Sequence, residues 1–127
     1  MADPLFLLDS NICIYLLKGA SDAVRRRVES HAPGELVTSA IVFAEVMMGM
    51  RSSDEAARAE IFFALVTVLP FDRPAAETYV TLSFKRGSYD RLIGAHALSL
   101  GLTLVTANER DFLDLPRLRV ENWTIDG

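Results

Sequence analysis

LFLLDSNICIYLL, residues 5–17, joins two apolar segments of different kinds through three polar residues. The short run LFLL (5–8) predicts a buried strand, and NICIYLLKG (11–19) predicts a short helix that Gly19 closes. Asp9, Ser10 and Asn11 lie at the junction. Asp9 either starts the helix or belongs to a functional site. Other carboxylates in apolar surroundings are needed to decide between these two roles.

The rest of the chain continues the alternation of strands and helices. Further strands are expected at 35–39, 67–71, 102–107 and 118–123, and further helices at 21–31, 39–50, 52–66, 73–87 and 88–101. The expected helix boundaries are Ser21, Ser53 and Ser88 as N-caps, Pro74 at a first turn, and Gly87 and Gly101 at helix ends. This order predicts an α/β fold, a three-layer α/β/α sandwich around a parallel sheet of about five strands. Sites in such sheets form at the carboxyl ends of the strands, where Asp9 is placed.

Composition limits the class of protein. The 127 residues are 50% apolar and 24% charged, which excludes a disordered chain and fits one domain over residues 1–127. The single cysteine, Cys13, is expected to be buried packing, and a reducing cytoplasm is the expected compartment. No apolar run approaches the ~20 residues of a membrane span, and the first residues lack the basic segment of a signal peptide.

The net charge of −4 argues against a protein that coats nucleic acid non-specifically. Two local basic clusters remain, Arg25–Arg27 and the set of Lys85, Arg86 and Arg91. Each is either a solvated helix face or part of a groove that binds a polyanion.

Three further acids are candidates for a site with Asp9. Glu45 lies in the apolar segment IVFAEVMMGM, where an unpaired charge would be costly to bury. Asp90 lies in the first turn of a largely apolar helix, and an acid there also has the ordinary role of favouring a helix N-terminus. Asp111 follows the fourth strand and is either a site residue or a loop acid. Asn108, close by, can bind through its amide oxygen or hold a turn.

A cluster of these carboxylates would repel itself strongly. At ~4.5 Å and an effective dielectric constant of ~20, each pair costs roughly 3–4 kcal/mol. Three pairs approach the stability of a whole domain, about 10 kcal/mol. Such a cluster must hold protons or a cation, and oxygen ligands favour Mg²⁺ or Mn²⁺ over zinc. His31 and His96 are expected to be structural. Asp9 is therefore interpreted as a metal ligand that Ser10 and Asn11 hold in place.

Four segments then resemble a known family, the PIN-domain ribonucleases, and within it the VapC toxins of bacterial type II toxin–antitoxin pairs. They are, in order, LLDSNICIYLLKG, SAIVFAEVMMGM, YDRLIGAHALSLGLTLVTANERDF and LRVENW. By position, Asp9, Glu45 and Asp90 match the three core acids of the family. Asp111 matches its less regular fourth acid, and Asn108 stands where many relatives have Asp.

The resemblance implies a Mg²⁺- or Mn²⁺-dependent endoribonuclease that cuts transfer or ribosomal RNA and leaves a 5′-phosphate and a 3′-hydroxyl. It also implies a homodimer that a VapB antitoxin neutralises in a larger complex. Operator DNA is then contacted only through the antitoxin, and no membrane is involved.

Three alternatives were weighed against this interpretation. A phosphatase of the haloacid dehalogenase type needs a second Asp two residues after the first, where this chain has Asn11. A two-component receiver domain needs an acidic pair by the first strand and an Asp on a middle strand, and neither is evident. The third is a non-catalytic PIN fold that only binds RNA or a partner. The set Asp9, Glu45 and Asp90 argues against it, because such a protein has no physical reason to keep a repelling cluster.

Overall fold

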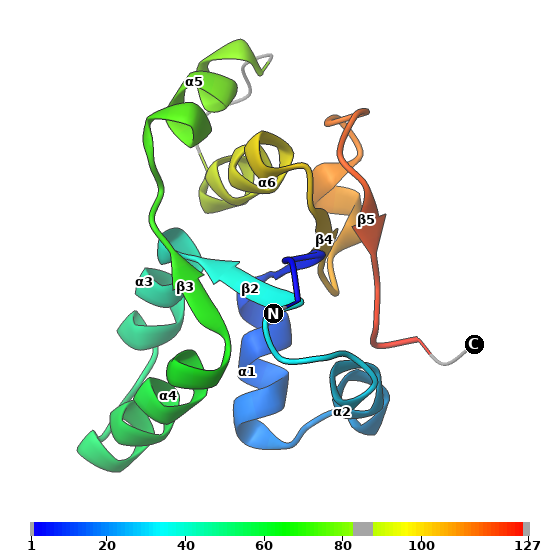
Figure 1. Cartoon of the computed structure of the whole chain (residues 1–127). Coiled ribbons are helices and arrows are strands. Elements are labelled where there is room, and N and C mark those ends of the chain that lie inside the picture. Colours follow the sequence, from blue (N-terminus) through cyan, green and yellow to red (C-terminus); the bar gives the residue numbers. More distant parts are fainter. Residues whose placement is uncertain (1, 83–87, 126–127) are drawn as a thin grey trace.

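The computed structural model describes residues 2–82 and 88–125, which form a parallel sheet between two layers of helices (Figure 1). Within these residues the sheet has five strands in the order β3-β2-β1-β4-β5, all parallel. The strands are β1 (Phe6–Leu8), β2 (Leu36–Ser39), β3 (Thr67–Leu69), β4 (Thr103–Val105) and β5 (Val120–Glu121). The predicted α/β/α sandwich is confirmed, and the last strand lies at an edge of the sheet.

The helices divide between the two faces of the sheet because the strand order reverses at β1. They are α1 (Ser10–Lys18), α2 (Asp22–Glu29), α3 (Ala40–Met48), α4 (Ser53–Leu65), α5 (Arg73–Thr81) and α6 (Tyr89–Leu100), with a short 3₁₀ helix, η1 (Glu109–Phe112). Figure 1 shows α1, α2 and α4 on one side and α5 and α6 on the other. Helix α3 packs against α1 and α4 and also reaches α6. Right-handed crossovers require this change of face when the chain reverses direction across the sheet.

Most helix boundaries agree with the caps expected from the sequence. The Ser21 and Ser88 hydroxyls accept the hydrogen bonds of N-caps, and Gly19 and Gly101 end α1 and α6 with φ values of 62° and 68°. One expected cap is wrong by a residue. Ser52, not Ser53, caps α4, and its hydroxyl accepts from the Glu55 amide at 3.1 Å.

Helix α5 is shorter than expected. It ends at Thr81, whereas the sequence pattern predicted a helix over 73–87. Its predicted closing residue, Gly87, lies outside the described residues. Pro74 lies in the first turn of α5, as expected. None of the helices in the described ranges is long and apolar enough to cross a membrane.

The core holds the strand ends that carry the candidate site. Leu7, Leu8 and Leu104 are fully buried, and so is Cys13, as expected. Burial raises the pKa of the Cys13 thiol, which suits a packing role.

Aromatic contacts join the residues around β5 to those around α2. The Trp123 ring stacks on His31 with the ring centroids 5.3 Å apart, and Phe6 meets the Trp123 ring edge-on at 5.0 Å. The Arg27 guanidinium carbon lies 4.9 Å from the centroid of the Trp123 ring and so covers it. These contacts agree with the structural role expected for His31.

Candidate functional site

Asp9 lies at the carboxyl end of β1 and takes the first of the two roles that the sequence left open, the start of a helix. It is the N-cap of α1, and its Oδ1 accepts a hydrogen bond from the Ser10 amide at 2.8 Å. It is also a buried carboxylate, only 2% exposed. Burial raises the pKa of Asp9, and the charge of Asp111 adds to the rise. Helix capping alone does not require burial, so Asp9 has the character of a site residue.

The register of the sheet places Thr106 beside Asp9. Leu8 pairs with Val105 on β4, so the residues that follow them, Asp9 and Thr106, come out of the sheet together. The Thr106 hydroxyl donates to Asp9 Oδ2 at 2.7 Å. This bond partly offsets the effect of burial on the pKa of Asp9. Sequence reasoning did not find Thr106, although a hydroxyl residue directly after a strand at the switch point of the sheet was a signal for it.

Glu45 reaches the same edge from α3. The helix begins at the Ser39 N-cap, and Ser39 directly follows Thr38, the partner of Leu8 on β2. The Glu45 side chain is half-buried, and its Oε1 atom is buried without a hydrogen-bond partner. Burial raises the pKa of Glu45, and the charges of Asp9 and Asp90 raise it further. An unpartnered buried carboxylate oxygen is costly unless something else binds it.

Asp90 enters from the other face, in the first turn of α6. The pKa of Asp90 is raised to about 6, first by burial and then by the charges of Asp9 and Asp111. A hydrogen bond from the protonated Asp90 carboxyl to Asp111 contributes to this rise in pKa. Asp111 lies exposed in η1, after β4. Four segments distant in sequence thus each contribute one acid to a group that we call the carboxylate cluster. It consists of Asp9, Glu45, Asp90 and Asp111.

Neither of the two asparagines near the cluster donates a side-chain hydrogen bond to a carboxylate in the described residues. Asn11 was expected to hold Asp9, but its Oδ1 accepts from the Ala107 amide at 3.2 Å and so ties the loop after β4 to α1. Ser10 was expected to do the same, and its hydroxyl does favour the ionised forms of Asp9 and Glu45 by lowering the pKa of each. The Asn108 amide donates to Thr106 Oγ1 at 3.1 Å. In the described part of the chain, no hydrogen bond joins the Asn108 side chain to the cluster.

The cluster has the donor chemistry of a hard-cation site. Its donors are all carboxylate oxygens, which favour Mg²⁺ or Mn²⁺. A bound cation would give the buried, unpartnered Oε1 of Glu45 a partner and would reduce the mutual repulsion of the carboxylates. Among residues 2–82 and 88–125, no three Asp, Glu, His or Cys side chains already surround a position for a metal ion. Binding therefore requires carboxylate side chains to move toward the ion.

Beside Asp90 and Asp111 lies a pocket of about 340 Å³, which Ser88, Arg91, Arg110, Leu113 and Asp114 also line. Arg110 is exposed there, next to the carboxylates.

Three residues of the two basic clusters form ion pairs with acidic side chains. Arg91 is only 7% exposed and forms an ion pair with Asp114, so it does not belong to a solvated basic face. Arg25 and Arg27 pair with Asp22 and Glu121. Lys85 and Arg86 lie outside the described residues.

Comparison with known proteins identifies the family. The family model described as PIN domain matches residues 6–118, a range that contains all four carboxylates. The tRNA(fMet)-specific endonuclease VapC of Shigella flexneri is 32% identical over 130 residues, which cover 94% of this chain and 98% of that protein. The chain belongs to the VapC family of PIN-domain ribonucleases.

Solved structures agree with this assignment. One is VapBC2 from Rickettsia felis, bound to a DNA fragment from its promoter. A chain of that structure superposes on this protein with a TM-score of 0.83 at 27% identity, and the match covers 94% of this protein and 98% of the matched chain. DNA-bound VapBC from Salmonella typhimurium gives a TM-score of 0.82 at 30% identity, with the same coverage. Both are toxin–antitoxin complexes that contain a VapC subunit, so the resemblance drawn from the four sequence segments is confirmed.

Proposed function

We propose that this chain is a cytoplasmic endoribonuclease toxin that uses Mg²⁺ or Mn²⁺ to cut structured RNA, either transfer or ribosomal RNA. The observation that carries the proposal is the carboxylate cluster. Four acids from separate segments meet at the switch point of the sheet, and burial and mutual repulsion raise the pKa values of Asp9, Glu45 and Asp90. Membership of the VapC family supports the reaction class, and a relative described as a tRNA(fMet)-specific endonuclease supports the substrate class.

Asp9, Glu45 and Asp90 would hold the cation, with Asp111 or Asn108 as a further ligand. When bound, a hard divalent cation stabilises charge on the phosphate and lowers the pKa of a water molecule. Thr106 and Ser10 orient Asp9 for this task through the hydrogen bonds described above. Arg110, exposed in the neighbouring pocket, is suited to bind an RNA phosphate despite the acidic total charge.

The reaction is hydrolysis of a phosphodiester. The oxygen of a water molecule forms a bond to phosphorus, and the bond between phosphorus and the 3′ oxygen breaks. Water loses one proton and the leaving 3′ oxygen gains one, so the products are a 5′-phosphate and a 3′-hydroxyl. The protein would contribute mainly position and electrostatics, because its carboxylates would hold the cation beside the reacting phosphate at the sheet edge.

Cleavage of a labelled transfer-RNA pool tests the proposal. The purified protein, free of antitoxin, is incubated with the pool in Mg²⁺, beside a lane with EDTA and a lane with Asp90→Asn. Discrete fragments that disappear in both control lanes are expected. If neither the transfer-RNA pool nor ribosomal RNA is cut by the folded wild-type protein, the catalytic proposal fails and a PIN fold that only binds RNA or a partner takes its place.

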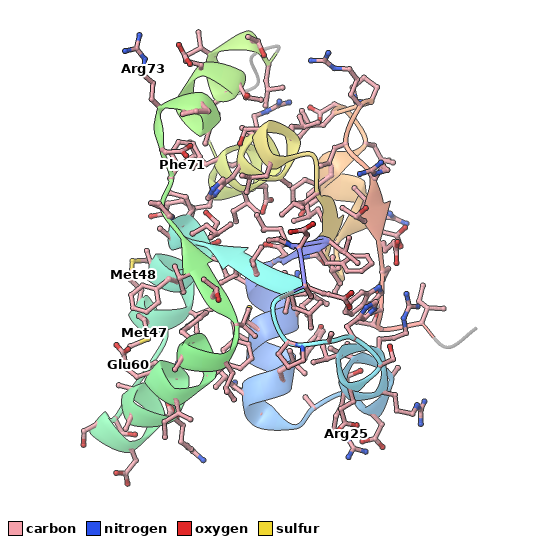
Figure 2. All side chains as sticks on the ribbon, in the orientation of Figure 1. Arg25, Met47, Met48, Glu60, Phe71 and Arg73 are labelled. Atoms are coloured by element: carbon pink, nitrogen blue, oxygen red, sulfur yellow. The ribbon has the colours of Figure 1, made fainter. Side chains whose placement is uncertain are left out.

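We also propose that the chain forms a homodimer and that a VapB-type antitoxin neutralises it in a larger complex that contacts operator DNA only through the antitoxin. Figure 2 shows Met47, Met48 and Glu60 on the outer side of α3 and α4, away from the sheet. Met48 of α3 and Ile61 and Leu65 of α4 are 70%, 65% and 75% exposed. Ile61 and Leu65 are four residues apart and so share one face of α4, and exposed apolar side chains of this kind favour a protein partner.

A groove nearby suits the antitoxin. It has a volume of about 160 Å³, with an apolar floor and a largely basic rim, and is lined by Ile14, Leu17, Lys18, Val46, Gly49, Met50, Arg51, Glu55 and Arg58.

The homodimer is tested by substitutions at exposed positions. Leu65→Glu should give a monomer in light scattering, while Val80→Glu, an exposed position on α5, should not. A wild-type protein that is already monomeric contradicts the homodimer.

A further inference from the structure

The segment that carries Asp111 is packed on α6, the helix that carries Asp90. Gly94 of α6 allows this close approach. A Cβ atom at position 94 would lie 2.7 Å from Leu115 Cδ1, and 3.6 Å from both Leu118 Cδ2 and Phe112 Cδ1. Phe112, Leu115 and Leu118 are all buried, so the chain after η1 is anchored to α6 by apolar contacts.

An ion pair lies on the same interface. The Arg91 guanidinium of α6 donates through Nη2 to Asp114 Oδ2. The Arg91 side chain is 9% exposed and the Asp114 side chain 36%. The other terminal nitrogen, Nη1, is buried without a hydrogen-bond partner. A buried guanidinium that loses its carboxylate leaves an uncompensated charge, so this pair strongly favours the packed position of the segment.

Both residues of the ion pair lie close in sequence to an acid of the carboxylate cluster. Arg91 directly follows Asp90, and Asp114 comes three residues after Asp111. Asp111 lies within η1 and Asp114 two residues beyond its end, and both line the pocket that Asp90 and Arg91 also line. Asp90 and Asp111 repel each other when both are ionised, and Asp111 is exposed. The Arg91–Asp114 ion pair adds to the apolar contacts an attraction that opposes this repulsion.

We propose that the Arg91–Asp114 ion pair is a positioning clamp that holds Asp111 against Asp90, so that the fourth carboxylate stays within reach of the cation. Arg91 and Asp114 act through Asp111 and touch neither the cation nor the RNA. The inference rests on the proposed function only for the existence of the cation site. It assigns a role to two residues that do not themselves belong to the carboxylate cluster.

A double-mutant cycle on Mn²⁺ affinity tests the clamp, because metal binding is measured without RNA. Mn²⁺ is titrated by calorimetry at 25 °C into the wild type, Asp114→Ala, Asp111→Asn and the double variant. Residues that orient ligands typically contribute 10- to 100-fold in metal affinity. Asp114→Ala should therefore weaken Mn²⁺ binding by roughly tenfold in the wild-type background. It should have no further effect in the Asp111→Asn background.

A purely structural role predicts a different pattern. Asp114→Ala would then change Mn²⁺ affinity equally in both backgrounds, or not at all, and either result overturns the clamp. Glu77→Gln, which removes the exposed ion pair with Arg73 on α5, is the matched control and should leave Mn²⁺ affinity unchanged. If Asp114→Ala does not fold, Asp114→Asn replaces it, because the Asn amide oxygen still accepts from Arg91. A smaller loss with the same dependence on Asp111 is then expected.

RNA cleavage by the same proteins separates this inference from the proposed function. If Asp114 affects Mn²⁺ binding through Asp111 but the wild type cuts no RNA, the clamp stands and the catalytic proposal fails. If the wild type cuts RNA and Asp114→Ala binds Mn²⁺ normally, the catalytic proposal stands and the clamp fails. A wild-type protein that does not bind Mn²⁺ overturns the clamp as well.

Discussion

The Thr106 hydroxyl donates a hydrogen bond to Asp9 across 2.7 Å, and this bond joins the carboxyl ends of β4 and β1. A second bond reinforces the junction, since the Asp9 amide donates to the Val105 carbonyl at 2.9 Å. The strand order reverses between β1 and β4, which is where sites form in open parallel sheets. Thr106 therefore fixes the carboxylate on which the rest of the cluster converges.

Thr106→Val should weaken cation binding more than it weakens the fold. The substitution keeps the shape of the side chain but removes the hydrogen bond to Asp9. Mn²⁺ affinity should fall by about tenfold, and the free energy of unfolding should fall by about 1–3 kcal/mol. Titration calorimetry and urea denaturation measure the two effects. Thr38→Val is the matched control, because the buried Thr38 hydroxyl donates to the Leu8 carbonyl at 2.7 Å. It should lose stability without losing Mn²⁺ affinity, and equal losses of affinity in both variants would contradict the role of Thr106.

Glu45→Gln should make the metal-free protein more stable. The substitution removes one charge from a repelling cluster, and the free energy of unfolding at pH 7.5 should rise by on the order of 1 kcal/mol. The stabilisation that Mn²⁺ gives the wild type, about 2.7 kcal/mol at 100 times Kd, should be largely lost. Thermal and urea denaturation with and without Mn²⁺ measure both effects. Glu60→Gln, on the exposed side of α4, should behave as the wild type does. A metal-free Glu45→Gln protein that is less stable than the wild type would show that the other carboxylates do not repel the charge of Glu45.

His96 should make the fold sensitive to mild acid. It is 1% exposed, its Nδ1 lies 2.8 Å from Ser39 Oγ, and the ring of Phe71 meets it edge-on with the centroids 5.4 Å apart. Burial lowers the pKa of His96 below 6.5, and the charge of Asp72 only partly opposes this. A lowered folded-state pKa means that the unfolded chain takes up the proton first as the pH falls. The contribution of His96 is therefore complete above pH 6.5 and is lost progressively below it.

The comparison of wild type with His96→Gln isolates this contribution, because the carboxylates titrate in both proteins. Urea midpoints are measured at pH 7.5, 6.5 and 5.5. Between the first and last values, the wild type should lose stability relative to His96→Gln. Parallel profiles would mean that His96 is not held neutral by the fold.

Gly94→Ala should destabilise the protein although alanine is the better helix former. The gain in helix propensity is about 1 kcal/mol, whereas overpacking a buried contact costs about 1–3 kcal/mol. The new Cβ would lie 2.7 Å from Leu115 Cδ1, and Leu115 is only 4% exposed, so it has little room to move. A net loss of about 1 kcal/mol in urea denaturation is expected. A gain in stability would mean that the chain after η1 is packed more loosely on α6 than the structure shows.

The elements that position the site could be predicted because each carries a local signal. A short apolar run ends in Asp9, and the alternation of strands and helices requires a parallel sheet whose carboxyl ends meet. Glu45 and Asp90 stand out because each charge interrupts an apolar helix. The adjacent serines at 52 and 53 are equally good N-caps by residue type, so the start of α4 could not be fixed from the sequence alone.

The contacts that the sequence did not reveal join residues far apart in the chain. The bond from Thr106 to Asp9 depends on the register between β1 and β4, and the Arg91–Asp114 pair depends on how the chain folds back over α6. Arg91 was grouped with Lys85 and Arg86 because neighbouring basic residues are usually solvated. Arg91 is instead buried and paired with Asp114, a contact that no local pattern encodes.

The most direct test of the central claim is an anomalous difference map from crystals of this protein soaked in Mn²⁺. The account predicts a peak among the carboxylates of Asp9, Glu45 and Asp90, with the Oε1 atom of Glu45 turned toward it, and no such peak in Asp9→Asn. A well-ordered cluster without a peak, in crystals that bind Mn²⁺ elsewhere, would contradict the claim that these carboxylates form a cation site.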